Sequence, residues 1–208
     1  MMKIFMLRHG QTEWNVLRKV QGSADVPLNE NGRKVAAETA EVLGQIPFDY
    51  IFTSPLKRAR ETAEYVADIL HKELILDHRL EEIDFGVYEG IAEEELQERG
   101  IEFHKMFFEH PDQFEPGEGG ERIIDTVNRA GEFLREVIEP LEGKAENILL
   151  VSHGELLHAM LVYMFDRPLS QLWGNGKTRN CETHMISYTQ GKYRLIEEAK
   201  IFRKGEVL

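Results

Sequence analysis

The stretch Ile4-Phe5-Met6-Leu7-Arg8-His9-Gly10-Gln11-Thr12-Glu13-Trp14-Asn15 decides the fold of this chain. Four apolar residues of strand type are followed at once by an arginine, a histidine and a glycine. A buried strand that ends in this way delivers polar side chains to the carboxyl edge of a sheet, where open α/β sheets bind their ligands. The glycine lets the backbone turn sharply and lets a ligand approach closely. On these residues alone, a functional site and a strand end with two solvated side chains fit equally well.

Two further strand ends change that balance. Val151-Ser152-His153-Gly154 repeats the His-Gly pattern after an apolar run, and Thr53-Ser54-Pro55 leads into a predicted helix that carries Arg58. The carboxyl ends of parallel strands meet at one edge of a sheet. One guanidinium group can donate hydrogen bonds to two oxygens of the same phosphate, and helix N-termini also favour anions. The sequence therefore predicts a pocket for a tetrahedral dianion, formed by Arg8, His9, Arg58 and His153.

The order of predicted elements indicates an α/β fold. Strands are predicted at residues 2–7, 50–53, 74–76 and 147–151, helices at 29–44, 56–71, 122–138 and 156–165, and a final hairpin at 185–196. Alternation of strands and helices favours a parallel or mixed sheet with helices on both faces. Residues 92–116 are acidic with interspersed phenylalanines, and we expect one or two short helices there, lying over the sheet edge as a cap. No repeat or linker divides the chain.

Composition excludes several classes of protein. The chain has 208 residues and a net charge of −12, which argues against general nucleic-acid binding because that needs a basic surface. The single cysteine, Cys181, excludes an internal disulfide and a cysteine-based zinc cluster. The start of the chain does not resemble a signal peptide, and the longest apolar stretch, residues 156–165, is too short to span a bilayer. We therefore expect a cytoplasmic protein without membrane or nucleic-acid partners.

Phosphoryl chemistry needs a nucleophile and a proton donor besides an anion pocket. Imidazole can act as a covalent nucleophile, and its ordinary pKa near 6.5 leaves much of it neutral at pH 7. The Leu80–Gly90 segment shows neither helical nor strand periodicity and offers Glu81, Glu82 and Asp84 as acids. The sequence contains no Walker-type loop and no evident acidic metal cluster.

Six blocks, in order along residues 1–180, resemble the histidine phosphatase superfamily, the phosphoglycerate-mutase-like group. The blocks are Leu7–Asn15, Asp25–Gly32, Thr53–Ala59, Leu80–Gly86, Gly119–Glu121 and Val151–Gly154. The resemblance implies a three-layer α/β/α sandwich with a mostly parallel, mixed central sheet and a small helical cap. It implies one domain over residues 1–208, with a cap insertion at about 92–116.

The resemblance also implies residue roles. His9 would be the nucleophile that passes through a phosphohistidine, and Glu82, which precedes the Ile-x-Phe-Gly segment, would be the acid–base residue. The phosphoryl group would be held by Arg8, Arg58 and His153. The positions that match substrate-binding residues are Asn15, Gln21, Gly22 and Gly154. The implied mechanism uses no metal and no cofactor.

Simpler interpretations stay open for several residues. Asn15 could only cap a turn, while Glu81 and Asp84 fit solvated neighbours of the acid. His158 lies on an apolar helix and fits a packed or surface histidine, and Cys181 fits a structural role. The remaining histidines lack a supporting motif.

Within the family, the sequence favours a phosphatase acting on a small phosphorylated metabolite. The cap segment has only Arg99 and Lys105 as cations and is rich in phenylalanine, so an apolar or neutral leaving group is expected. Its Phe-rich character resembles the broad-specificity phosphatases of the family. The alternatives are a cofactor-dependent phosphoglycerate mutase, a metal hydrolase built on His9, His153 and Glu82, and a phosphate-binding sensor without activity. The oligomeric state stays open, with a homodimer as one option.

Overall fold

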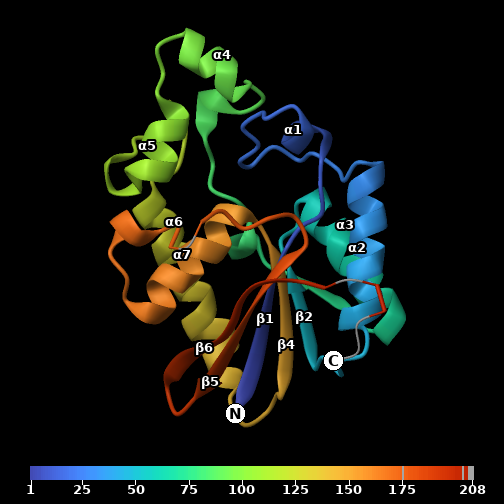
Figure 1. Cartoon of the computed structure of the whole chain (residues 1–208). Helices are drawn as coiled ribbons and strands as arrows, with labels where there is room; N and C mark the ends of the chain where they lie inside the picture. The colour runs from blue at the N-terminus through green and yellow to red at the C-terminus, as the bar shows by residue number, and fades with distance from the viewer. Residues whose placement is uncertain (175, 203, 206–208) are drawn as a thin grey trace.

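The computed structural model describes residues 1–174, 176–202 and 204–205, and this part of the chain contains a six-stranded sheet. The strands are β1 (Met2–Arg8), β2 (Tyr50–Thr53), β3 (Leu74–Leu76), β4 (Asn147–Ser152), β5 (Glu182–Thr189) and β6 (Lys192–Ile201). Their spatial order is β3-β2-β4-β1-β5-β6 (Figure 1). The first four strands are parallel, whereas β5 runs antiparallel to β1 and β6. The predicted mostly parallel, mixed sheet is confirmed.

Strand register places three carboxyl ends side by side. In the parallel ladder of β1 and β4, Arg8 lies opposite Ser152. In the ladder of β2 and β4, Thr53 lies opposite Val151. The residues that follow these strands, His9, His153 and Ser54, therefore leave the same edge of the sheet.

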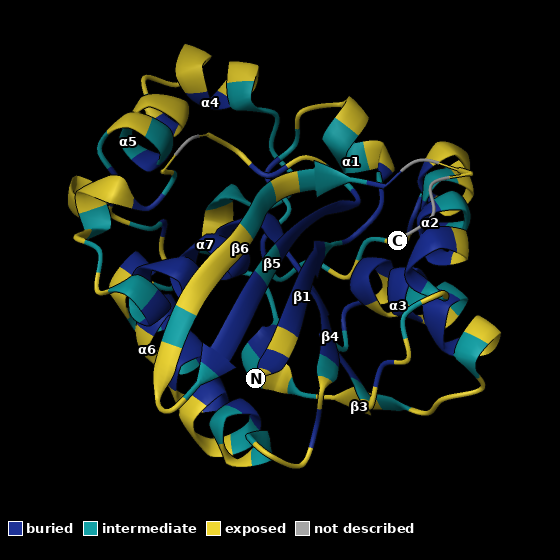
Figure 2. Ribbon diagram, turned by 60° about the horizontal axis from the view of Figure 1, so that its bottom comes forward, coloured by how far each residue is buried: buried dark blue, intermediate teal, exposed yellow. Residues whose placement is uncertain are grey.

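Two helices cover each face of the sheet, which makes the predicted three layers. Figure 1 shows α2 (Glu30–Leu43) and α3 (Lys57–Leu70) on one side, and α6 (Ile123–Phe133) and α7 (Gly154–Phe165) on the other. Side chains of a strand alternate between faces, so Leu7 packs in the cluster under α2 and α3 while Met6 packs in the cluster under α6 and α7. The central strands are buried on both faces, whereas β6 is exposed over much of its length (Figure 2).

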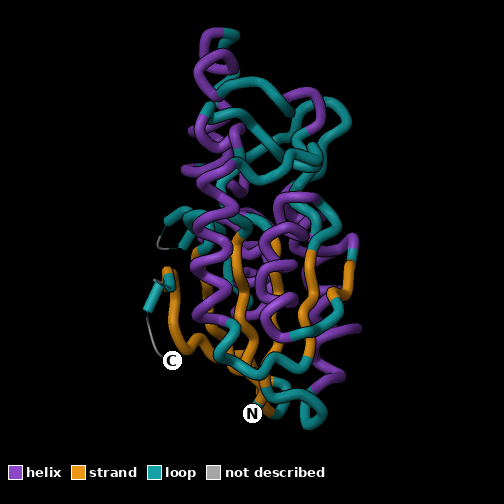
Figure 3. The backbone as a smooth tube through the Cα atoms, turned by 90° about the vertical axis from the view of Figure 1, so that its right-hand side faces the viewer, coloured by secondary structure: helices purple, strands orange, loops and turns teal. Residues whose placement is uncertain are grey.

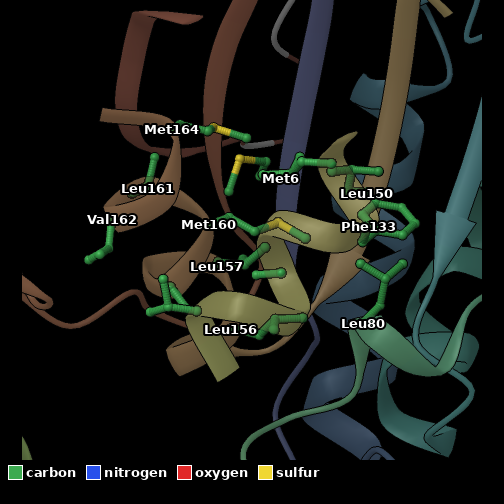
Figure 4. Packing of buried hydrophobic residues seen from close by; sticks show 14 of the residues in the cluster. Met6, Leu80, Phe133, Leu150, Leu156, Leu157, Met160, Leu161, Val162 and Met164 are labelled. Atoms are coloured by element: carbon green, nitrogen blue, oxygen red, sulfur yellow. The ribbon is translucent and has the colours of Figure 1, made fainter. Parts of the chain in front are cut away.

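α7 is the most buried helix of the sandwich. Its residues are apolar on nearly every side, so no polar face is available for solvent. Figure 4 shows Leu157 and Met160 of α7 packed near Met6 of β1 and Phe133 of α6. Burial of each such side chain contributes roughly 1.5–3 kcal/mol. This packing fixes the N-terminus of α7 at the sheet edge.

The shorter elements lie mainly in connections. The short α-helices are α1 (Glu13–Val16), α4 (Glu93–Glu98) and α5 (Phe103–Glu109), and a π-helical segment, Leu134–Ile138, continues α6. The 3₁₀ turns are His78–Leu80, Gly86–Tyr88, Pro111–Gln113, Glu139–Leu141 and Leu169–Gln171. α4 and α5 lie beyond the carboxyl ends of the strands and form the predicted cap (Figures 1 and 3). Among the described residues, no helix has the length and apolar character needed to cross a membrane.

The phenylalanines of the cap pack mainly against one another and against Phe85. Phe103, Phe107 and Phe114 are buried, and their rings pack around Phe85 at centroid distances of 5.0 to 6.2 Å. They attach the cap to the Leu80–Gly90 segment. Aromatic side chains of short helices gain more free energy from mutual burial than from an exposed position, so these rings face the core.

Three predicted boundaries also differ. α7 begins at Gly154 rather than Leu156, because the chain turns directly from β4 into the helix with His153 as its N-cap. The predicted helix over residues 122–138 becomes π-helical after Phe133. The final hairpin is longer than predicted, because β5 already begins at Glu182 and β6 continues to Ile201.

Candidate active site

His9 and His153 meet at the edge of the sheet, as the sequence predicts for two parallel strands with the same ending. Their ring centroids are 5.2 Å apart, with 57° between the ring planes. Both side chains are buried. The central adjacency of β1 and β4 therefore brings together two residues that are distant in the sequence.

His9 presents one specific nitrogen to the site. Its Nδ1 lies 2.6 Å from the carbonyl oxygen of Gly10, and a carbonyl can only accept, so Nδ1 carries the proton and donates it. In the neutral ring Nε2 then keeps its lone pair. The pKa of His9 is well below its ordinary value, first because the ring is buried and then because Arg58 and Arg8 are nearby. The ring is therefore neutral at pH 7, and the lone pair of Nε2 is available.

His153 is held by the opposite nitrogen. Its Nε2 lies 2.8 Å from the hydroxyl oxygen of Ser54, at the end of β2. Its Nδ1 is buried and has no hydrogen-bond partner among the described residues. Burial, followed by the charge of Arg58, lowers the pKa of His153 well below its ordinary value. This ring is neutral as well.

Arg58 lies in the first turn of α3 and is completely buried. Its Nη1 donates to the carbonyl of Ala24 and its Nη2 to the carbonyl of Gly22, each at 2.6 Å. Gly22 has a φ of +54°, and a Cβ there would overlap the carboxylate of Glu89, so only glycine fits. Burial lowers the pKa of Arg58 to about 10, which leaves it cationic at pH 7.

Arg8 follows the last apolar residue of β1. Its Nη1 donates to the carbonyl of Thr178, near the end of the loop before β5. Gly154 lies against the guanidinium, since a Cβ at Gly154 would be 3.5 Å from Arg8 Nε. Burial is the main cause that lowers the pKa of Arg8.

Glu82 is held at the N-terminus of α7. Its Oε1 accepts from the backbone N–H of Leu156 at 3.1 Å, and its Oε2 accepts from that of Glu155 at 3.3 Å. The carboxylate interacts electrostatically with both Arg8 and Arg58. The two other acids that the sequence offered are engaged elsewhere: Glu81 contacts His78, and Asp84 accepts from the N–H of Gly86.

Three buried nitrogens of the site have no protein partner among the described residues. They are Arg8 Nε, Arg58 Nε and His153 Nδ1. Buried polar atoms without a hydrogen bond are rare in folded proteins, and each costs about 1–3 kcal/mol. Two of the three belong to cations. An anion with several oxygens would satisfy this set.

Asn15 and Gln21 both contact Thr12. Asn15 forms a capping box with Thr12 at the start of α1, and its Oδ1 accepts from the backbone N–H of Thr12 at 3.0 Å. Gln21 Oε1 lies 2.9 Å from the Thr12 hydroxyl. The contacts of the Asn15 side-chain oxygen therefore fit the simpler interpretation, in which Asn15 caps a turn.

The comparison with protein families agrees with this geometry. The model of the histidine phosphatase superfamily, branch 1, matches residues 4–199. The chain belongs to the histidine phosphatase superfamily.

Individual relatives of this histidine phosphatase include enzymes of two kinds. Phosphoserine phosphatase 1 of Hydrogenobacter thermophilus is 34% identical over 85% of this chain and 82% of its own length. The Escherichia coli protein named probable phosphoglycerate mutase GpmB is 29% identical over 91% of this chain and 86% of its own length. A solved mycobacterial glucosyl-3-phosphoglycerate phosphatase, complexed with VO3, superimposes with a TM-score of 0.86 at 28% identity. That alignment covers 94% of this chain and 97% of the other.

No sequence pattern indicates the loop residues that support this site of the histidine phosphatase. Asn180 Nδ2 lies 3.1 Å from the carbonyl of His9 and 3.2 Å from that of Gly10. The backbone N–H of Cys181 donates to the carbonyl of Arg8 at 3.1 Å. These contacts fix the turn after β1. Because the segment before β5 has no periodicity, only the tertiary fold shows that it reaches the site.

Glu155 is a second residue that the sequence did not single out. Its side chain is buried, and neither carboxyl oxygen has a hydrogen-bond partner among the described residues. Burial, followed by the charge of Glu82, raises the pKa of Glu155 well above its ordinary value. An acid with a raised pKa therefore lies next to Glu82.

A large cleft lies between the end of α1 and the cap. Its volume is about 940 Å³, and its lining includes Arg18, Glu93 and His104. Lys177 borders the cap at the same end, with Nζ 3.0 Å from His104 Nε2. The mouth of this cleft is therefore charged. Arg18 and Lys177 come from outside the cap segment, so the cations of that segment alone did not predict the charge of this cleft.

The described residues contain no group of three or more His, Cys, Asp or Glu side chains arranged to hold a metal ion. His9 and His153 lie beside two arginines, which repel a cation. The residues at the sheet edge therefore fit an anion better than a metal.

Proposed function

We propose that this protein is a phosphatase that hydrolyses small phosphate monoesters through a covalent phosphohistidine on His9. The observation that carries the proposal is the set of three buried nitrogens without protein partners beside a neutral His9. A phosphoryl group placed there accepts hydrogen bonds from Arg8, Arg58 and His153. The same groups stabilise the charge on its equatorial oxygens during transfer.

In the first step, His9 Nε2 attacks the phosphorus atom, and the bond from phosphorus to the leaving oxygen breaks. The Gly10 carbonyl holds the proton on Nδ1, so the ring is aligned for this attack. Glu82 gives a proton to the leaving oxygen, and the alcohol departs. The products of this step are phosphohistidine, the free alcohol and the carboxylate of Glu82.

In the second step, water attacks the phosphohistidine, and Glu82 takes a proton from that water. The bond from phosphorus to His9 Nε2 breaks, which restores the neutral ring and releases inorganic phosphate. Glu82 ends the cycle protonated again, because the proton from water replaces the one that left with the alcohol. The backbone donors at the N-terminus of α7 hold its carboxylate in one place during both steps.

His153 contributes a hydrogen-bond donor when its proton is on Nδ1. The Ser54 hydroxyl supports this tautomer by donating to Nε2, which lies 2.8 Å away. Since Ser54 Oγ also accepts from the backbone N–H of Leu56, its hydroxyl proton is free to point toward the ring.

The charged cleft suggests the class of substrate. We infer a polar, charged leaving group rather than the apolar or neutral group expected from the sequence, because charged side chains line the cleft. They are Arg18, Lys105, Glu93, Glu94 and Glu102. Glu93 interacts with Lys177 and offers a partner for an amino group. Phosphorylated hydroxy acids and amino acids fit this mouth. The names of two relatives, which contain phosphoserine and phosphoglycerate, are consistent with this class.

The decisive experiment compares the wild-type protein with His9→Ala. Released phosphate is measured with p-nitrophenyl phosphate, O-phosphoserine and 3-phosphoglycerate in the presence of EDTA, and acid-labile phosphate on the protein is trapped by rapid quenching at high pH. Turnover and trapped phosphate in the wild type, both lost in His9→Ala, are expected. His78→Ala is the control because this exposed histidine lies outside the site. Activity that survives in His9→Ala, or that EDTA abolishes, would contradict the mechanism.

A mutase is the second candidate, favoured by the similarity to the relative named phosphoglycerate mutase. The same assay distinguishes it, because a mutase returns the phosphoryl group to a second hydroxyl instead of water. Formation of 2-phosphoglycerate with little released phosphate, in the presence of a bisphosphoglycerate primer, would identify the mutase.

A further inference from the structure

We propose that Thr178, His158 and His184 form a buried hydrogen-bond chain that positions Arg8 for the phosphoryl group. None of the three contacts the reacting atoms, so their effect passes through Arg8. The inference rests on the proposed function only in that it takes the ligand of Arg8 to be a phosphoryl oxygen.

The central member of this chain is the hydroxyl group of Thr178. Its Oγ1 lies 2.9 Å from His158 Nε2 and 3.1 Å from His184 Nε2. All three side chains are nearly inaccessible, each with 2% exposure. A hydroxyl has one proton to donate, so one histidine must donate to it while the other accepts.

The backbone decides which histidine donates. His184 Nδ1 accepts from the backbone N–H of Ala199, at 3.4 Å. A neutral His184 therefore carries its proton on Nε2 and donates to Thr178. The Thr178 hydroxyl then donates to His158 Nε2. The direction of the whole chain is fixed from Ala199 to His158.

Thr178, the central residue of this hydrogen-bond chain, also holds Arg8. The carbonyl of Thr178 accepts from Arg8 Nη1. Because the guanidinium is a rigid planar fork, fixing one edge fixes the direction of the others. Arg8 Nε, which has no partner among the described residues, is thereby aimed rather than free to rotate. A bidentate contact to phosphate depends on this orientation.

A local distortion of β6 supports the chain. The ladder between β5 and β6 shifts register on both sides of Met185, so His184 faces an irregular stretch. Ala199 in that stretch has a φ of +61°, a left-handed backbone conformation that non-glycine residues rarely adopt. Strain of this kind persists where the surrounding structure requires it, often near functional sites. Here it accompanies the backbone N–H that fixes the tautomer of His184.

Both histidines are neutral, as the chain requires. Burial lowers the pKa of His158 to about 3 and also lowers the pKa of His184. His158 additionally packs against the ring of Trp173 at a centroid distance of 4.9 Å. The hydrogen-bond directions therefore hold throughout the neutral pH range.

The test measures binding of inorganic phosphate by calorimetry, so it does not depend on turnover. Thr178→Val keeps the shape of the side chain and removes the hydroxyl, whereas Thr178→Ser keeps the hydroxyl. We expect the valine variant to bind phosphate about tenfold more weakly and the serine variant to bind within about twofold of wild type. Thr126→Val is the matched control, because Thr126 is buried in α6 and its hydroxyl has no partner among the described residues.

A double-mutant cycle separates positioning from general damage. In an Arg8→Met background the Thr178→Val change should alter phosphate affinity by less than about twofold, because its effect acts through Arg8. An equal loss in both backgrounds, or no loss in either, would overturn the proposal. Wild-type protein that binds no phosphate would overturn it as well.

A second pair of variants covers the case in which Thr178→Val does not fold. His184→Gln keeps a donor near the position of Nε2, and His184→Met removes it. Weaker phosphate binding in the methionine variant that glutamine restores is the expected result, and equal binding by the two variants would contradict the chain. Failure of the proposed function would appear differently, as normal phosphate binding in the wild type without ester hydrolysis.

Discussion

Strands β1 and β4 both end in a His-Gly pair, but the two histidines present opposite ring nitrogens to the site. After β1, His9 donates from Nδ1 to the next carbonyl in the chain, which leaves Nε2 for attack. After β4, His153 is engaged at Nε2 by the Ser54 hydroxyl, which leaves Nδ1. Both rings are buried and neutral. In the proposed mechanism, the different roles of the two rings, nucleophile and hydrogen-bond donor, therefore follow from the partner of each ring.

The partners themselves have different origins. Gly10 is the neighbour of His9 in sequence, so this contact is local. Ser54 comes from the end of β2, which lies next to β4 in the sheet, so its contact with His153 depends on tertiary structure. We therefore expect amide replacements to affect the two histidines differently. An asparagine or glutamine that imitates one ring nitrogen should restore part of the activity at position 153 but not at position 9.

The largest effect is expected for His9. His9→Asn and His9→Gln place amide groups near Nδ1 and Nε2 respectively, yet an amide nitrogen is not nucleophilic. Both variants should lose on the order of 10⁴-fold in kcat for p-nitrophenyl phosphate, because covalent catalysis is absent. If either amide variant kept more than a tenth of the activity, His9 would have to act as a donor like His153, and the contrast would fail.

A smaller and more selective effect is expected for His153. His153→Ala should lower kcat/KM by about 10²–10³-fold, as loss of one donor to a transition-state oxygen does. His153→Asn can place an amide N–H near Nδ1 and should recover about tenfold of that loss, whereas His153→Gln should not. Steady-state kinetics of the three proteins make the comparison. Recovery by glutamine instead of asparagine would show that Nε2 is the working nitrogen.

Ser54 tests the support of that tautomer. Ser54→Ala removes the hydroxyl next to His153 Nε2 and should lower kcat/KM by about tenfold, the value of one buried hydrogen bond. Ser152→Ala is the matched control, because Ser152 is the last residue of β4 and donates to the carbonyl of Leu80 instead of to a ring. The control should lower the free energy of unfolding but change kcat/KM by less than about twofold. Equal kinetic losses in the two variants would refute a specific role of Ser54.

The smallest effect concerns stability. The folded pKa of His158 is about 3, below its unfolded value of about 6.5, so the unfolded state binds more protons under acidic conditions. The contribution is complete above pH 6.5 and decreases as the pH falls toward 3. Between pH 7.5 and 5.5 this residue should lower the free energy of unfolding by about 1.4 kcal/mol.

Urea titrations at the two pH values measure this loss. His158→Gln stays uncharged at both pH values, so its loss between pH 7.5 and 5.5 should be smaller than that of the wild type by this amount. His9, His153 and His184 contribute in the same direction in both proteins, because their pKa values are also lowered. An identical pH dependence of the two proteins would mean that His158 is accessible to protons in the folded state.

Much of the fold follows from local pattern. The sequence predicted β2 and β3 with the observed bounds and placed α2 and α3 within one residue at each end, because apolar periodicity and helix-stop residues are local signals. It predicted α7 two residues too short, because Gly154 and Glu155 look like a polar turn until β4 and the helix are seen to join directly. The surface that the phenylalanines of the cap cover stayed open, because the periodicity of a short helix does not show it.

The sequence by itself determined the sheet, its helices and the identity of the polar residues at the strand ends. Local apolar patterns and the His-Gly endings, together with the resemblance of six blocks to one family, were sufficient for this. Tertiary structure alone decided which nitrogen each histidine presents, how Thr178 fixes Arg8 and where the charges of the cleft lie. The physical reason is that these properties depend on hydrogen bonds and fields between residues that are distant along the chain, such as Ser54 with His153 and Arg8 with Thr178.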